Sequence, residues 1–306
     1  MIKGKIDFRL AALWRFAVAI TLLNILGHFY LGFEQSWAQP VVAVATALTL
    51  EILLEILSAW GDGRPLRFAG GLFPFASFIL PAYITGLAVS MLLYSNDRLW
   101  PMALGAAIAV GSKYIFRVSV GSGTRHFLNP SNTGVAVTLL LFPWVGIAPP
   151  YQYTENLVGL WNWLLPALII VSGTYLNVNF TRKMPLILGW LIAFFGQAVI
   201  RSLIFGTPVA AALLPMTGLA FILFTFYMVS DPGTTPFERK AQVAFGVAVG
   251  VVYGLLVTMH VVFGIFFALI IVCTVRGLWL YAQTLPIRRA AQPSPEVPKT
   301  AIAGGS

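Results

Sequence analysis

Pro74-Phe75-Ala76-Ser77-Phe78-Ile79-Leu80-Pro81 and Pro208-Val209-Ala210-Ala211-Ala212-Leu213-Leu214-Pro215 are two copies of one pattern. In each copy two prolines bracket a short apolar run, and a Thr-Gly pair follows, at Thr85-Gly86 and at Thr217-Gly218. A proline inside a helix removes a backbone hydrogen bond and clashes with the preceding turn, so each copy predicts a broken helix. Paired broken helices indicate a duplicated membrane protein with a site between its repeats, where we expect Thr85 and Thr217. The alternative is a chance match in apolar, proline-containing sequence.

The composition places the chain in a membrane. Apolar residues make up 58% and charged residues 9%, with a mean hydropathy of +0.85, whereas soluble domains carry about 25% charged residues. A membrane-spanning helix needs about 20 apolar residues. By this criterion we predict about ten transmembrane helices, an all-α polytopic protein, with spans at 10–33, 40–60, 68–94, 99–116, 130–147, 159–178, 184–205, 207–229, 241–259 and 260–282.

The positions of the basic residues account for the net charge of +9 without a nucleic-acid partner. Most Lys and Arg residues fall on one side of the membrane if the N-terminus is cytoplasmic, and this excess predicts that both termini are cytoplasmic. The third span then runs outward and the eighth inward, so we expect two inverted five-helix repeats with broken third and eighth helices. The predicted parts are a cytoplasmic N-terminus (1–9), the first repeat (10–147), an outer loop (148–158), the second repeat (159–282) and a disordered cytoplasmic tail (283–306).

Two loops contain residues suited to binding a ligand. Gly121 to Gly134 includes a glycine-rich turn that leads into Asn129-Pro130, which is typical of a capped helix start with free amide groups for an anion. Asp231-Pro232-Gly233-Thr234-Thr235-Pro236 is likewise a stiff, capped turn. The alternative is that both loops only terminate helices. As cofactor-binding candidates the loops contribute Gly123, Arg125, Asn129, Asp231 and Thr234.

Taken in order, the motifs resemble the RnfD/NqrB family, the large membrane subunits of the Rnf complex and of the sodium-pumping NADH:quinone reductase. The similarity extends over most of residues 40 to 280. The motifs that carry it are Glu51 and Glu55, Gly63-Arg64-Pro65-Leu66, Thr85-Gly86, Gly111-Ser112-Lys113-Tyr114, Asn129-Pro130 and Met228-Val229-Ser230-Asp231-Pro232-Gly233-Thr234-Thr235-Pro236.

This resemblance implies a subunit of the bacterial inner membrane that moves electrons through a flavin and is coupled to ion movement. It also implies other membrane and cytoplasmic redox subunits as partners. In the family a Ser-Gly-Ala-Thr motif in the outer loop attaches FMN covalently, but the loop here lacks that motif, and Thr154 is a candidate by position alone. We therefore expect FMN or riboflavin to bind noncovalently, as in a divergent, UnbU-like branch.

Glu51 and Glu55 are the expected ion pathway. They lie four positions apart, and therefore on one helix face, within the second span. Ionisable residues within a membrane-spanning segment indicate proton or cation passage. The alternative is a structural partnership with Arg15 or with polar neighbours. The single cysteine, Cys273, excludes a cysteine-ligated cluster, and no metal site is expected.

Two other classes of function fit the same sequence. A permease or channel could use an inverted-repeat fold without a cofactor, because fold does not dictate function. A membrane scaffold for a biosynthetic assembly of the enediyne type is the third possibility. The chain shows no soluble catalytic domain or nucleotide motif, so we do not expect an autonomous enzyme.

Overall fold

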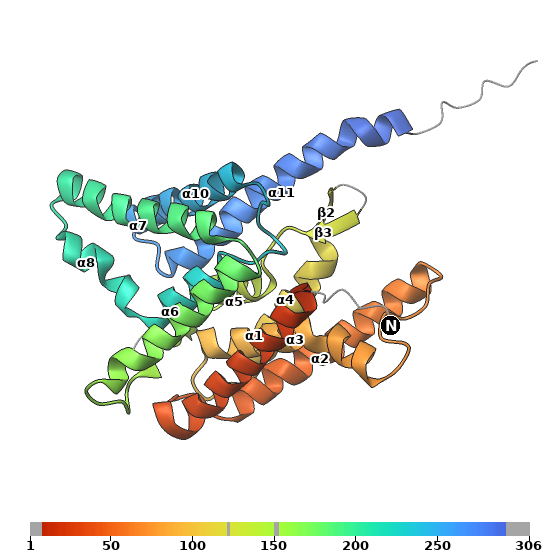
Figure 1. Cartoon of the computed structure of the whole chain (residues 1–306), viewed down its shortest axis with the longest axis horizontal. Helices are drawn as coiled ribbons and strands as arrows, with labels where there is room; N and C mark the ends of the chain where they lie inside the picture. Colours follow the sequence, from red (N-terminus) through yellow and green to blue (C-terminus); the bar gives the residue numbers. More distant parts are fainter. Residues whose placement is uncertain (1–7, 121–122, 150–152, 292–306) are drawn as a thin grey trace, which may run out of the picture.

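The computed structural model describes residues 8–120, 123–149 and 153–291, and it is almost entirely helical (Figure 1). The first seven residues of the predicted N-terminal segment and the last fifteen of the predicted tail lie outside these ranges. The helices of the first half are α1 (Phe8–Leu26) with a π-helical continuation η1 (Gly27–Leu31), α2 (Ala38–Gly61), α3 (Leu72–Leu92), α4 (Trp100–Ile115) and α5 (Pro130–Leu141). Those of the second half are α6 (Trp161–Asn179), α7 (Met184–Phe205), α8 (Val209–Leu213), η3 (Leu214–Thr217), α9 (Leu219–Leu223), η4 (Phe224–Met228), α10 (Arg239–Thr258) and α11 (Gly264–Ala291).

The protein is an all-α, multi-pass membrane protein by the length and composition of its helices. Six described helices are long and apolar enough to cross a membrane, and a seventh span results if the bent segment from Val209 to Met228 is counted as one. Every predicted span contains a helix, but α4, α5 and α6 are not among these six. With 12 residues, α5 rises about 18 Å, well short of the roughly 30 Å hydrocarbon core.

The predicted break in the third span is wrong, whereas the break in the eighth is confirmed. α3 continues without interruption through Pro81. The Thr85 hydroxyl donates to the Pro81 carbonyl oxygen at 2.7 Å, and neighbouring helices pack against α3, so the loss of one hydrogen bond is tolerated. In the second copy the helix axis turns by 74° next to Gly218, because Pro215 lies in a 3₁₀ turn and Gly218 has an extended backbone.

Four short strands, which the sequence pattern did not predict, form two antiparallel pairs in the segments between helices. β1 (Leu93–Tyr94) pairs antiparallel with β4 (Gly146–Ile147), and β2 (Arg117–Val120) pairs antiparallel with β3 (Gly123–His126). The glycine-rich turn before Asn129 is therefore part of a β-hairpin, with residues 121–122 outside the described structure.

The two ends of the molecule differ in what holds them together. At one end, which we call the β1–β4 end, Ala148 donates its N–H to Leu92 O at 2.9 Å and the Tyr153 hydroxyl donates to Met91 O at 3.2 Å. At the opposite end of α2, ion pairs join Glu55 to Arg64 and Glu51 to Lys113. We call this the charged end. The arrangement separates the predicted outer loops from the loops predicted to be cytoplasmic.

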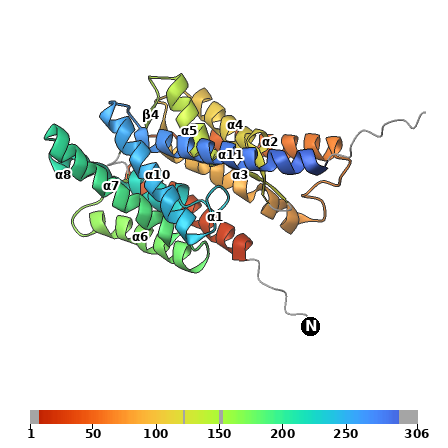
Figure 2. The same ribbon diagram turned by 90° about the horizontal axis from the view of Figure 1, so that it is seen from above.

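The two halves pack their helices in corresponding pairs. In the first half α3 packs on α1 and α2, α4 on α2, and α5 on α4. In the second half the bent segment packs on α6 and α7, α10 on α7, and α11 on α10. α11 also contacts α5 and β2, and so joins the halves (Figure 2). Among the described residues, the packing of α3 on α4 and α5 has no comparable counterpart in the second half.

Glycines bring α7 and α10 into close contact. A Cβ atom at Gly246 would overlap the Leu186 carbonyl oxygen, and one at Gly250 would overlap the Ala193 side chain. Beside this seam, the indole N–H of the fully buried Trp190 donates to Thr225 Oγ1 at 3.0 Å. Small residues at such interfaces let helix backbones approach closely in a membrane.

The tail predicted as disordered begins too early. α11 continues to Ala291, so residues 283–291 are helical and the prediction for them is wrong. The prediction relied on a composition rich in Pro, Ala, Ser and Gly, but α11 continues through Pro286, because a single proline removes only one helical hydrogen bond.

Candidate functional site

The structure brings the two predicted turns into direct contact where the halves meet. Asn129 caps α5, and its Oδ1 accepts a hydrogen bond from the N–H of Asn132 at 2.9 Å. Its Nδ2 donates across the junction to Met228 O at 3.2 Å and reaches Asp231 Oδ2 at 3.5 Å. A single asparagine therefore fixes the start of α5 and holds the loop of the other half.

The Asp231 turn is closed by its own side chain. Asp231 Oδ1 accepts from the N–H of Gly233 at 3.0 Å, and Oδ2 accepts from the Thr234 hydroxyl at 3.1 Å. The Thr235 hydroxyl donates to the Asp231 carbonyl oxygen. Aspartate commonly closes turns in this way, and this supports the structural alternative for Thr234, whose hydroxyl is occupied within the turn.

Next to the cap of α5 is a buried acceptor that no described group satisfies. Asn132 is 1% exposed, and its Nδ2 donates to Phe266 O of α11 at 3.0 Å. Among the described residues, no hydrogen-bond donor reaches Asn132 Oδ1. Buried polar atoms are almost always paired, so an unpaired acceptor next to a functional candidate is unusual.

Three basic side chains surround the same loop. Lys183, which precedes α7, donates from Nζ to Pro236 O at 2.5 Å, and Arg276 of α11 donates from Nη1 to Thr234 O at 2.9 Å. The guanidinium of Arg125 lies 4.6 Å from the centre of the Phe237 ring, and Lys183 Nζ lies 4.9 Å from the same ring. We call Arg125, Lys183 and Arg276 the cation cluster.

Burial makes the charge on Lys183 costly. Its side chain is 1% exposed, and the loss of water lowers its pKa to about 8. Asp231 acts in the opposite direction, while Arg276 and Arg125 lower the pKa further. Lys183 therefore lies in the electric field of all three charged neighbours.

Glu51 and Glu55 are both engaged in ion pairs. Glu51 Oε2 lies 2.6 Å from Lys113 Nζ of α4. Glu55 accepts two hydrogen bonds from the Arg64 guanidinium, at 2.6 and 3.1 Å, and one from the Arg67 N–H at 2.9 Å. These contacts support the structural alternative.

Arg15 does not pair with Glu51 or Glu55 in the described structure. Its guanidinium lies instead 4.8 Å from the centre of the Phe180 ring.

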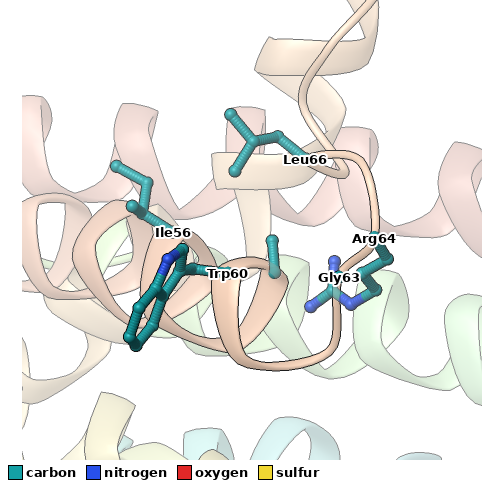
Figure 3. Close-up of a pocket in the computed structure, with 6 residues that line it drawn as sticks. Ile56, Trp60, Gly63, Arg64 and Leu66 are labelled. Carbon is teal, nitrogen blue, oxygen red and sulfur yellow. The ribbon is translucent and has the colours of Figure 1, made fainter.

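A shallow pocket of about 370 Å³ adjoins the Glu55–Arg64 pair (Figure 3). Ile56, Ala59, Trp60, Gly63, Arg64 and Leu66 line it.

The other residues predicted for the site are Thr85, Thr217, Gly123 and Thr154. The Thr85 hydroxyl donates to Pro81 O, and the exposed Thr217 donates to Leu214 O, so each bonds within its own segment. Gly123 begins β3 and is exposed. Thr154 lies in a turn at the β1–β4 end.

No sequence signal pointed to Lys113 as the partner of Glu51, to Asn132 as an unpaired acceptor, or to Lys183 and Arg276 as site residues. In the sequence Lys183 and Arg276 are two of the many basic residues on the predicted cytoplasmic side, and they indicate sidedness alone. They lie 93 positions apart in the printed numbering, and no local pattern reveals that distant helices bring them together. The comparisons with known proteins supply no further guide, because no protein-family model and no curated protein matches the chain.

Proposed function

We propose that the chain is a membrane subunit of an electron-transport complex and binds a flavin noncovalently where its two halves meet. The observation that carries the proposal is the hydrogen bond from Asn129 to Met228 O, which joins the two turns that the sequence analysis named independently. The ordered motifs shared with the RnfD/NqrB family support the same function.

The residues at the junction suit the polar edge of a flavin. The buried, unpaired Oδ1 of Asn132 can accept a hydrogen bond from a ring N–H, and the amide of Asn129 can donate to a ring carbonyl. A bound flavin supplies one- and two-electron transfer. The protein contributes the binding groups, the burial and the fixed positions of both turns.

The proposed arrangement is two inverted five-helix repeats with both termini in the cytoplasm of a bacterial inner membrane. The corresponding packing in the two halves supports a duplication. The charge distribution supports the cytoplasmic assignment of the charged end.

Flavin binding is better supported than ion passage through Glu51 and Glu55. Each of these carboxylates already has a basic partner, at 2.6 Å in both cases. A proton or cation arriving at Glu51 would have to replace the Lys113 ammonium. Ion movement therefore remains a secondary part of the proposal.

The test is the flavin content of the purified full chain in lipid nanodiscs, after expression with FMN and riboflavin available. We expect visible flavin absorption that denaturation releases completely, since the outer loop lacks the covalent motif. Asn132→Leu and Asn129→Leu should lose most of the flavin. Asn179→Leu is the matched control, because Asn179 is exposed and donates to Tyr175 O within its own helix.

Two outcomes contradict the proposal in different ways. A protein free of flavin under all loading conditions would favour the permease or scaffold functions. A flavin-labelled peptide that contains Thr154 would replace noncovalent binding with covalent attachment.

A further inference from the structure

The cation cluster has more positive charge than its surroundings balance. Lys183 interacts with the charges of Asp231, Arg276 and Arg125, and the Asp231 carboxylate is already bonded to Gly233 and Thr234. Among the described residues, none of the three cations has a carboxylate oxygen within 4.0 Å. Lys183 and Arg276 bond instead to the neutral carbonyl oxygens of Pro236 and Thr234. Buried charges are usually paired, and Lys183, the buried member of the cluster, has two further cations and one engaged carboxylate as its charged neighbours.

Two helix starts lie beside the cluster, and the carboxylate of Glu238 at the start of α10 offsets part of their positive potential. Lys183 directly precedes α7, and Phe237 lies next to Glu238, the residue that precedes α10. Lys183 Nζ lies 4.9 Å from the Phe237 ring, so both starts open near the same place. Neither start has a side-chain cap hydrogen bond in the described structure. Free N–H groups at helix starts favour anions.

The side chains of the cation cluster differ in their exposure to solvent. Lys183 is buried, Arg276 is half-buried, and Arg125 and Phe237 are exposed. An anion can approach through Arg125, whose planar guanidinium can donate two parallel hydrogen bonds to a phosphate. The field of the two more deeply placed cations then adds to the attraction.

We infer that the cation cluster binds the phosphate group of a small, soluble phosphate monoester. The identity of that ligand rests on the proposed function, under which it is FMN rather than riboflavin. The site lies beside the Asn129–Asp231 junction, because Arg276 and Lys183 bond to the same loop that Asn129 holds. The cluster would hold the phosphate while the junction holds the ring.

The experiment compares FMN, riboflavin and inorganic phosphate on the full chain in nanodiscs of neutral lipid at low salt. We expect FMN to bind at least about tenfold more tightly than riboflavin, as one charge-assisted hydrogen bond allows. Arg125→Gln and Arg276→Gln should each weaken FMN about tenfold and leave riboflavin within about twofold. Arg98→Gln removes an equal charge from an exposed position at the β1–β4 end and should change neither.

The outcomes separate this inference from the proposed function. Equal affinity for the two flavins, or an equal loss of both in the arginine variants, would overturn the phosphate site and leave flavin binding intact. If neither flavin binds, but inorganic phosphate raises the melting temperature of the wild type and not of Arg276→Gln, the phosphate site stands and the flavin function fails. Nanodiscs that contain phosphatidic acid test a lipid headgroup as the occupant. If this lipid displaces FMN from the wild type, and if Arg125→Gln and Arg276→Gln weaken the effect of the lipid, the cluster binds a lipid headgroup and the inference is overturned.

Discussion

Lys113 Nζ lies 2.6 Å from Glu51 Oε2, with 11% and 8% of the two side chains exposed, and this pair joins α4 to α2. Removing one member of a buried pair leaves an uncompensated charge. We therefore expect Lys113→Met to lower the free energy of unfolding by about 3 kcal/mol. The double variant Glu51→Gln/Lys113→Met should recover most of the loss. Unfolding of the purified variants in nanodiscs measures both values.

The matched control for this pair is Lys240→Met, which removes an exposed lysine and should stay close to the wild type. A double variant as unstable as Lys113→Met alone would mean that the pair is not the cause. In that case the packing of the lysine stem would account for the loss.

The sidedness of the loops can be tested by reporter fusions. Fusions at Arg64, Arg125 and Arg239 should report the cytoplasm, and fusions at Asp97 and Glu155 should report the outside. The reason is the strong excess of Lys and Arg on one side. The inverted five-plus-five arrangement would be wrong if Arg125 and Arg239 reported opposite sides.

Lys183 predicts an unusual response of stability to pH. Its pKa is about 8 in the folded protein, below its ordinary value of 10.5. Below pH 8 the folded state holds a desolvated charge, and between about pH 8 and 10.5 the unfolded chain binds more protons than the folded one. The free energy of unfolding therefore gains a contribution that rises with pH across this window.

Melting temperatures measured from pH 7 to 10.5 test this contribution by comparison. Lys183→Met should reduce the rise, and Lys240→Met, which removes an exposed lysine, should keep it. Identical pH profiles for wild type and Lys183→Met would show that the buried ammonium has no such effect.

The seam between α7 and α10 predicts opposite effects for two glycine substitutions. Gly246→Ala places a methyl group against the Leu186 carbonyl oxygen and should lower the free energy of unfolding by about 1–3 kcal/mol. Gly196→Ala meets no atom within 4 Å and should leave stability unchanged or raise it by up to about 1 kcal/mol. Equal effects in an unfolding experiment would argue against tight packing at Gly246.

The sequence predicted the elements better than their contacts. Apolar runs located a helix in every predicted span, because long hydrophobic segments are a strong signal. The break at Pro81 was predicted wrongly, since neighbouring helices decide whether a proline interrupts a helix. The pairing of β1 with β4 was also missed, because two-residue strands leave no periodic pattern in the sequence.

The candidate site was predicted in part. Asn129 and Asp231 were named from their turn chemistry, and the structure places them in contact. Lys183 and Arg276 could not be found in this way, because their role depends on how α7 and α11 pack around one loop. Nor did the spacing of Glu51 and Glu55 reveal that each has a basic partner from another segment.

The difference between the β1–β4 end and the charged end has a consequence for how the protein responds to ionic strength. Dissolved ions screen exposed charges over about 10 Å at 0.1 M and act much less on backbone hydrogen bonds. Concentrated salt should therefore weaken the attraction between Glu55 and the exposed Arg67 at the charged end, while the buried Glu51–Lys113 pair and the pairing of Leu93 with Ile147 persist. Salt would thus separate the exposed layer of the charged end, which depends on ionic strength, from the buried pairs and backbone hydrogen bonds, which do not.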